Sequence, residues 1–421
     1  METKNGVQKK HYYYIVTAAC GILLGIVFMG QASLYSPIAP FLRERFSLTY
    51  TQTSIIATMQ NLASVASTLM ITTIYDNLGV RRGLLIPLAC GVASAVLFCI
   101  ANGFVMICIA ASLSYFCFGL GGMMPASLIM KRWFVKRRGL ILGLCSAGSG
   151  ITSMLLSGWI ASRVATRGIA SAETVIAVFI GVGGLIILLF IRNTPEEMGL
   201  AAYGEDAGEG EPAAKTKKKV QYINIKPLNP KEKIIMCIAV VCCGFTGFGA
   251  IPNFTLAATS LNYDPVFVGG LIGITGALAI GGKPFYGVLA DLIGAHKANF
   301  VYMTGVAAAD FLLFMTRPGM DFSLYIVVII FGLGCYAITT VGVPIWTADL
   351  SGTDSYSRNL KTFQTCSTVG GLVSAPIPGI IADATGNYGI YYLMLGICLI
   401  FAMFTIAFMY GRHTKRVVDN Q

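Results

Sequence analysis

Long apolar stretches alternate with short polar or glycine-containing turns along almost the whole chain. A bilayer core of about 30 Å is crossed by about 20 helical residues, so each stretch is long enough for one membrane span. The pattern predicts twelve spans, at residues 13–39, 50–75, 83–102, 105–130, 138–162, 173–192, 232–258, 265–290, 298–316, 322–347, 359–382 and 387–410. We therefore expect an all-α membrane protein.

One long polar segment interrupts this pattern. Residues 194–230 carry acidic side chains first and a lysine-rich run afterwards, with six predicted spans on either side. Such a segment is too polar to enter a bilayer and is typical of a linker. We expect an N-terminal six-helix bundle over 1–193, a cytoplasmic linker over 194–230 and a C-terminal six-helix bundle over 231–421.

The composition agrees with a membrane location. Of the 421 residues, 55% are hydrophobic and only 12% are charged, against about 25% charged in soluble proteins. The net charge is +11. If both termini lie inside, 24 Lys and Arg residues fall on the inner side and five in outer loops. This positive-inside bias predicts a multi-pass protein of the cell membrane with both termini cytoplasmic. We expect it to be a monomer in contact with membrane lipids.

The same bias accounts for the basic balance without nucleic acid as a partner. A lipid-specific role for the basic linker stays open as an alternative. The twelve cysteines are scattered through apolar stretches, where we expect them to pack as small apolar side chains. No metal-ligand spacing and no catalytic constellation is visible. We therefore expect no metal, no cofactor and no enzymatic activity.

A short motif occurs twice, 215 residues apart. It reads Asp-x-x-Gly-x-basic-basic and begins at Asp76 and again at Asp291. A duplicated six-helix unit predicts two pseudo-symmetric bundles that face each other across a cavity. Secondary transporters often place their substrate near the membrane midplane at such a repeat interface.

This motif resembles the cytoplasmic signature loop of the major facilitator superfamily. The resemblance implies the major facilitator fold, with twelve transmembrane helices in two six-helix bundles. It also implies that the acidic and basic residues latch the two bundles at the inner face. Gating roles are therefore expected for Asp76, Arg82, Asp291 and Lys297.

Three further segments narrow the resemblance. They are the basic stretch 131–143, the stretch Asn-Thr-Pro-Glu-Glu-Met-Gly-Leu at 193–200 and the tripeptide Ser-Arg-Asn at 357–359. Together they resemble the oxalate/formate antiporter and monocarboxylate transporter branch. The basic stretch has a plain alternative, because positive residues gather on the inner side of any membrane protein.

A lysine inside an apolar run is the strongest functional signal. Lys283 lies eight residues before Asp291, about 12 Å into a core of about 30 Å. A charge at that depth costs about 2.5–3.5 kcal/mol and usually has a function. Pro284 cannot donate to the Ile280 carbonyl, so we expect a kink there. We interpret Lys283 as the cation that holds an anionic substrate; the alternative is a buried ion pair with Asp310.

In the resembled branch this position carries an arginine that binds the substrate carboxylate. A lysine offers one ammonium in place of a bidentate fork. Oxalate carriers have a second cation where this chain has Ser367, so a single cation favours a monoanion. Animal-type members have an acid one turn before the cation, and this chain has Ala279 there. Their route for proton coupling is therefore not visible in the sequence.

The resemblance also marks the positions of an aromatic cage. They correspond to Ser33, Met123, Tyr336 and Thr340, of which only Tyr336 keeps a ring. We expect a roomier pocket than one for a small planar dianion. Asn253 and Gln364 are further polar candidates. Each of these polar residues has the alternative of an ordinary interhelical hydrogen bond.

These observations predict a secondary active transporter of a small organic monoanion that works by alternating access. An empty carrier must move an unneutralised lysine through a closed state, which favours exchange of one anion for another. A buried lysine that releases its proton would instead allow proton-coupled symport. An exporter of drugs or amphiphilic metabolites, a dicarboxylate or formate exchanger and a transport-inactive sensor are the alternatives.

Overall fold

The computed structural model describes residues 12–29, 32–134, 138–200, 202–203, 221–224 and 228–417. Ten helices in these ranges are long and apolar enough to cross a membrane. An eleventh span is possible where Thr73–Gly83 and Leu85–Ile100 meet at 76°. The prediction of an all-α, multi-pass membrane protein is confirmed. The expected count of twelve is consistent with this set, since Tyr12–Phe28 is a further, shorter apolar helix.

The chain divides into two compact units. The first comprises Met1–Leu48 and Ile55–Ala213, and the second comprises Thr49–Ser54 and Ala214–Gln421. The first turn of one helix, α4, is thus grouped with the second unit.

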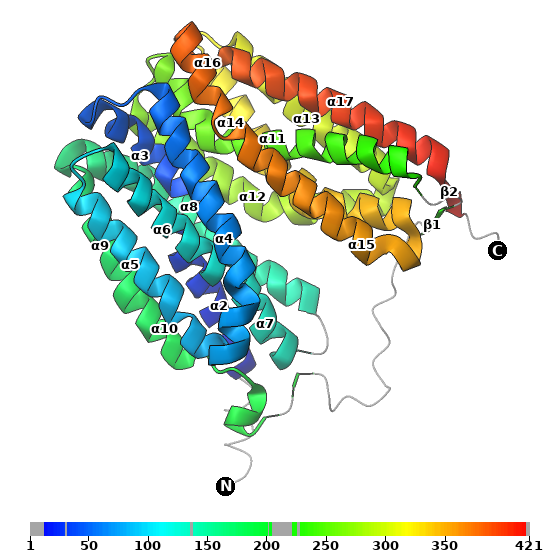
Figure 1. Cartoon of the computed structure of the whole chain (residues 1–421), viewed down its shortest axis with the longest axis horizontal. Helices are drawn as coiled ribbons and strands as arrows, with labels where there is room; N and C mark the ends of the chain where they lie inside the picture. Colours follow the sequence, from blue (N-terminus) through cyan, green and yellow to red (C-terminus); the bar gives the residue numbers. More distant parts are fainter. Residues whose placement is uncertain are drawn as a thin grey trace. The chain divides into compact units, whose positions relative to one another are not determined.

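The first unit is entirely helical in its named elements (Figure 1). They are α2 (Tyr12–Phe28), α3 (Ala32–Arg45), α4 (Tyr50–Gly83), α5 (Leu85–Ile100), α6 (Phe104–Gly121), α7 (Met123–Trp133), α8 (Arg138–Arg167), α9 (Ile169–Val178), the π-helix η1 (Phe179–Gly183), α10 (Gly184–Phe190) and the 3₁₀ helix η2 (Pro195–Met198).

The first predicted span differs from a single helix. The apolar run 13–39 is divided into α2 and α3. Where α2 ends, the Met29 amide donates to the Ile26 carbonyl at 3.2 Å. α3 then carries two internal prolines, Pro37 and Pro40. A proline has no amide N–H to donate, so each removes one backbone hydrogen bond from the helix. Hydropathy alone does not show this loss.

The second unit contains seven α-helices among the described residues. Its elements are α11 (Pro230–Ser260), α12 (Pro265–Ile293), α13 (Ala295–Met315), α14 (Asp321–Ala337), the π-helix η3 (Ile338–Gly342), α15 (Val343–Ser374), α16 (Ile377–Thr385), α17 (Gly389–His413) and the strands β1 (Gln221–Asn224) and β2 (Thr414–Val417). Two candidate spans, Asp321–Ser351 and Arg358–Thr385, both run into α15.

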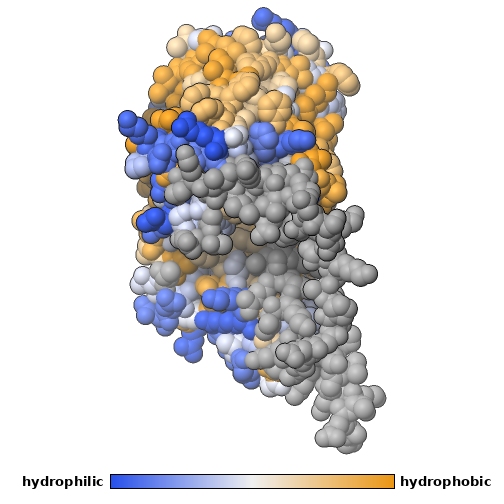
Figure 2. All heavy atoms as spheres, turned by 90° about the vertical axis from the view of Figure 1, so that its right-hand side faces the viewer, coloured by the Kyte–Doolittle hydropathy of each residue, from blue (hydrophilic) through white to orange (hydrophobic). Residues whose placement is uncertain are grey.

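Small residues let these helices approach closely. A Cβ on Gly244 of α11 would lie 2.1 Å from the Ser367 carbonyl oxygen of α15, and one on Gly282 of α12 would lie 2.4 Å from the Leu333 oxygen of α14. Neither position tolerates a larger side chain. Outward-facing residues are apolar instead: Leu69 is 77% and Phe322 76% exposed. Figure 2 shows the broad apolar areas that such residues form, as contact with lipid requires.

The two copies of the duplicated motif share one backbone conformation. Gly79 has φ 72° and ψ 162°, and Gly294 has φ 89° and ψ 146°. Glycine is the residue that adopts such angles without strain. The 215-residue repeat seen in the sequence is therefore present in the folded chain, with the same turn in both units.

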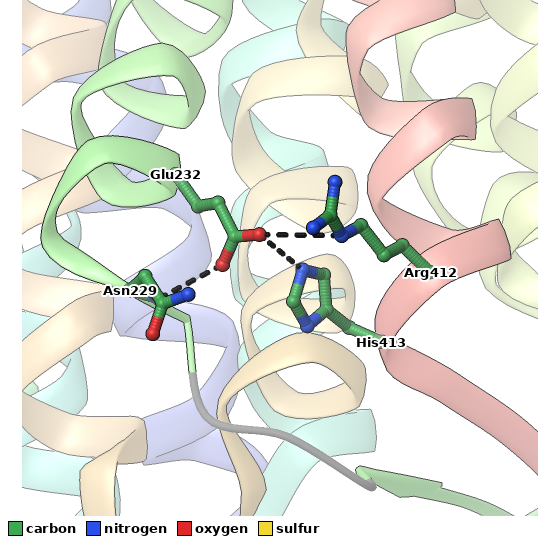
Figure 3. Close-up of polar contacts among 4 residues, drawn as sticks. All are labelled: Asn229, Glu232, Arg412 and His413. Carbon is green, nitrogen blue, oxygen red and sulfur yellow. Dashed lines mark hydrogen bonds and ion pairs between the residues drawn. The ribbon is translucent and has the colours of Figure 1, made fainter.

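A two-stranded ribbon joins the two ends of the second unit. β1 pairs with β2 antiparallel, with Gln221 opposite Val417 and Asn224 opposite Thr414. Beside it, Glu232 of α11 meets the end of α17 (Figure 3). Its carboxylate lies 3.1 Å from His413 Nε2 and 3.5 Å from Arg412 Nε, and it accepts the Asn229 amide at 2.9 Å. Neither strand was expected from the sequence.

Candidate functional site

Lys283 and Tyr336, two of the predicted site residues, meet in the second unit. Lys283 projects half-buried from α12, and its Nζ lies 5.9 Å from the centroid of the Tyr336 ring on α14. An ammonium at this distance is attracted to the ring face, by about 0.5–1 kcal/mol at an exposed site and about 2 or more when desolvated. The ring therefore positions the ammonium and leaves its N–H groups available to a ligand.

Lys283 has no carboxylate partner among the described residues. The ion pairs found there are those of Glu232 with Arg412 and His413. Asp310, the alternative partner, is fully buried in α13, and neither of its oxygens has a hydrogen-bond partner in the part of the chain that the structure describes. The alternative ion pair with Asp310 is therefore not formed.

The backbone around Lys283 is packed on one side and open on another. α12 continues through Pro284 as one helix, and the expected kink stays a prediction. Gly282 packs against Leu333 of α14, and its carbonyl accepts a hydrogen bond from Tyr302 Oη at 3.1 Å. At Gly281, by contrast, a Cβ would meet no atom within 4 Å. The backbone next to Lys283 is therefore held by packing on the Gly282 side and borders open space on the Gly281 side.

A buried polar cluster one turn further along α12 was not foreseen. Trp346 Nε1 donates to Tyr286 Oη at 3.0 Å, and that hydroxyl lies 3.5 Å from Asn299 Oδ1. The Tyr286 and Tyr302 rings stand edge to face, 4.7 Å apart. These contacts hold α12 against α13 and α15 and so fix the helix that carries Lys283. The sequence signal was present, since an aromatic residue follows the lysine by three positions.

The remaining predicted site residues have varied settings. Thr340, in η3, donates its hydroxyl to the Tyr336 carbonyl and is exposed. Asn253 is buried and donates to the Gly249 carbonyl of its own helix at 2.8 Å. Ser367 is buried, and its hydroxyl has no hydrogen-bond partner among the described residues. Gln364 is exposed on α15, and the side chain of Ser33 lies outside the described residues.

The structure thus brings Lys283 of α12 and Tyr336 of α14 together, while Thr340 in η3 is joined to the Tyr336 backbone carbonyl one helical turn earlier. Asn253 and Ser367 lie on the closely packed pair α11 and α15 instead. The hydrogen bond of Asn253 to Gly249 stays within α11, so it is not the interhelical bond given as the plain alternative.

The four predicted gating residues, Asp76, Arg82, Asp291 and Lys297, are all exposed, and none forms an ion pair with another described residue. Other side chains hold the two loops. Gating roles for these four residues therefore stay a prediction.

Each loop is tied to the unit that contains it by a different group. In the first unit, the Arg81 amide donates to Asn193 Oδ1 at 2.9 Å, and Arg81 Nε donates to the Leu188 carbonyl at 3.0 Å. In the second unit, the His296 ring lies 5.4 Å from the Tyr410 ring at an angle of 33°.

Two of the segments that narrowed the resemblance adjoin each other in the first unit. Trp133 is fully buried, and its Nε1 donates to the Arg192 carbonyl at 3.1 Å. The Tyr203 amide donates to the Trp133 carbonyl at 2.8 Å. The basic stretch therefore anchors the beginning of the linker through its tryptophan, while Lys131 and Arg132 are exposed at the end of α7.

Two helical units, a duplicated loop and a lysine within a membrane span that has no carboxylate partner among the described residues are typical of a membrane carrier. The family model of the Major Facilitator Superfamily matches residues 21–374 and 236–421. The chain belongs to this superfamily.

Known proteins place it on the expected branch. The chain is 24% identical to monocarboxylate transporter 13 of Rattus norvegicus over 286 residues, which cover 66% of the chain and 60% of that protein. It is 22% identical to the oxalate:formate antiporter of Oxalobacter formigenes over 298 residues, which cover 68% of the chain and 66% of that protein. The matches thus span less than two thirds of either relative, and the predicted resemblance to this branch is confirmed.

The fold is shared with solved transporters. The nucleoside transporter NupG superposes with a TM-score of 0.72 at 10% sequence identity, over 94% of this chain and all of that structure. The predicted major facilitator fold is therefore confirmed.

Proposed function

We propose that this chain is a secondary active carrier of small organic monoanions, with Lys283 as the group that binds the carboxylate. The observation that carries the proposal is the half-buried ammonium, which lies over Tyr336 and has no carboxylate partner among the described residues. A positive charge within a membrane span is costly, so it usually binds a ligand or pairs with another charged group. The names of the two relatives, a monocarboxylate transporter and an oxalate:formate antiporter, support an organic anion.

The substrate class follows from the number of cations. Lys283 supplies one positive charge and up to three donors, which neutralises one carboxylate. Ser367 occupies the position at which oxalate carriers have their second cation, and its uncharged hydroxyl cannot hold a second carboxylate in the same way. A monocarboxylate such as lactate or pyruvate therefore fits better than a dicarboxylate.

The transport cycle follows from the same charge. Moving an unpaired ammonium through a dry, closed state is unfavourable, and a bound carboxylate offsets much of this cost. The loaded carrier should reorient faster than the empty one, which favours exchange of one anion for another. We place the protein in the cell membrane with both termini in the cytoplasm, with 1–193 and 231–421 as the moving bundles and 194–230 as their linker.

The test is counterflow of labelled lactate and pyruvate in proteoliposomes that contain the full chain. Lys283→Ala should lower exchange by at least about 30-fold, since loss of one partner of a buried charge pair costs about 2–5 kcal/mol. Lys283→Arg keeps the charge and should restore part of the activity. Lys361→Ala, an exposed lysine on α15, is the matched control and should behave as the wild type.

A carrier of drugs or other amphiphiles would not need Lys283. Folding of each variant is checked by size-exclusion chromatography and thermal unfolding. Normal carboxylate exchange by a folded Lys283→Ala variant would contradict the proposed site, and uptake of neutral amphiphiles by that variant would support the exporter instead.

A further inference from the structure

A small cavity in the first unit contains a second ionisable group that the proposed function does not use. It has a volume of about 20 Å³, slightly more than the roughly 10–15 Å³ that one water molecule requires. Its lining is mostly apolar, with polar side chains from four helices: Tyr35 of α3, Ser94 of α5, Ser114 of α6 and Glu173 of α9.

Glu173 is the charged group of this cavity. It lies within the candidate span Ile169–Phe190 and is 5% exposed. It forms no hydrogen bond or ion pair with another described residue. Arg167, the nearest cation in sequence, is exposed and forms no ion pair with a described residue. Arg163 donates its Nε to the Ser171 carbonyl at 3.2 Å and lies over the Trp159 ring. Nothing in the described part of the unit therefore neutralises this carboxylate.

The other oxygens of the lining suit a cation better than an anion. Tyr35 Oη is buried and has no hydrogen-bond partner among the described residues. Ser94 Oγ donates its proton to the Ala110 carbonyl at 2.7 Å, so its lone pairs remain available as acceptors. A carboxylate with hydroxyl oxygens around it is the donor set that hard cations prefer.

The groups that face Glu173 across the cavity add no opposing charge. The titratable side chains of the lining are Tyr35 from α3 and Cys117 from α6, while α5 contributes Ser94 with small and apolar residues. A carboxylate in such a site is strongly disfavoured unless a cation accompanies it.

We propose that the Glu173 cavity binds one small monovalent cation, either a proton or Na⁺. A proton would bind to a Glu173 carboxylate oxygen itself. For Na⁺, the volume admits one ion of about the size of water, and the lining oxygens supply its ligands. The consequence for transport rests on the proposed function: the cation offsets the charge of the carboxylate that travels with it. This location differs from Ala279 on α12, the position to which the family resemblance assigns the acid of animal-type members.

Direct binding is tested by infrared difference spectroscopy on the purified full chain. A protonated carboxylic acid has a C=O stretch that a carboxylate lacks. The wild type should show a band of this kind that Glu173→Gln lacks, beside any band of the buried Asp310, which both proteins keep. A band that falls when NaCl replaces choline chloride identifies a Na⁺ site, and one that ignores Na⁺ identifies a proton site. Tyr35→Phe removes one hydroxyl and should weaken the cation affinity about 2- to 12-fold.

Coupling is tested by lactate uptake into proteoliposomes with an imposed pH gradient or an imposed Na⁺ gradient. One gradient should raise the initial rate of the wild type, and Glu173→Gln should give equal rates with and without it. Asp310→Asn removes the same charge from a buried site in the second unit and should keep the response.

The outcomes separate this inference from the proposed function. A carboxyl band that responds to neither pH nor Na⁺, or a folded Glu173→Gln variant that responds to the gradient as the wild type does, overturns the cation site. Absence of carboxylate counterflow in the wild type overturns the proposed function and leaves the infrared result unaffected.

Discussion

The two copies of the duplicated helix, α4 and α12, share a backbone conformation at their ends but carry different side chains. α4 and α12 both lead to a glycine with positive φ, at Gly79 and Gly294. The position 215 residues before Lys283 is Thr68, whose hydroxyl donates to the Ser64 carbonyl of its own helix at 2.9 Å. The turn is present in both copies, whereas only α12 carries the lysine. A function that depends on Lys283 is therefore carried by one half of the repeat.

The most direct test of whether both turns need glycine is to replace the two glycines by alanine. Gly79→Ala and Gly294→Ala each place a Cβ on a backbone with positive φ and extended ψ, which costs about 1–3 kcal/mol. Both variants should unfold at a lower temperature, and by similar amounts. Intrinsic fluorescence during heating in detergent measures this.

Gly103→Ala is the control for that pair, because its φ is −177° and a Cβ there would meet no atom within 4 Å. It should lower the transition temperature less than either loop variant, because it adds no strain and only replaces glycine by the poorer N-cap alanine at the start of α6. A clear loss of stability in only one of the two loop variants would show that the copies are not equivalent.

The tethers of the two loops should respond differently. Asn193→Ala removes the acceptor of the Arg81 amide and should weaken the first loop by about 0.5–1.5 kcal/mol, the usual net worth of one hydrogen bond. Hydrogen exchange followed by mass spectrometry should show faster exchange around Arg81 and no change around His296. Faster exchange in both loops would mean that they open together.

The smallest effect is expected at the ring beside the lysine. The position 215 residues before Tyr336 is Gly121, so this ring too is present in one copy only. Tyr336→Leu removes a cation–π contact of about 0.5–1 kcal/mol. The apparent affinity for the carboxylate in counterflow should therefore fall about 2- to 5-fold, while Tyr336→Phe, which keeps the ring, should match the wild type. Equal losses in both variants would assign the effect to the hydroxyl.

The membrane spans and the duplicated loop could be predicted from the sequence, because both depend on the order of apolar and polar residues along the chain. Apart from the first, the spans fall near the apolar runs that predict them, and Lys283 lies beside Tyr336. The contacts of Tyr286 with Trp346 and Asn299 could not be predicted. α12 is apolar around most of its circumference, so its sequence does not show which face meets protein and which meets lipid.

The Glu173 cavity was missed for a related reason. The predicted span 173–192 begins at this residue, so the acid looked like the edge of a loop. In the structure α9 begins at Ile169, which places the carboxyl inside the helix. Boundaries set by hydropathy shift by a few residues, and here the shift decides whether an acid is in water or among helices.

The β1–β2 ribbon gives the second unit a property that its helices alone do not have. Because the strands leading into α11 and out of α17 are paired, the start and finish of this unit adjoin each other. A short peptide connecting them would close the unit into a ring, and a cut at residues 317–320, between α13 and α14, would give it new ends. Circular permutation is tolerated where natural termini lie close together, so this half is suited to such rearrangement.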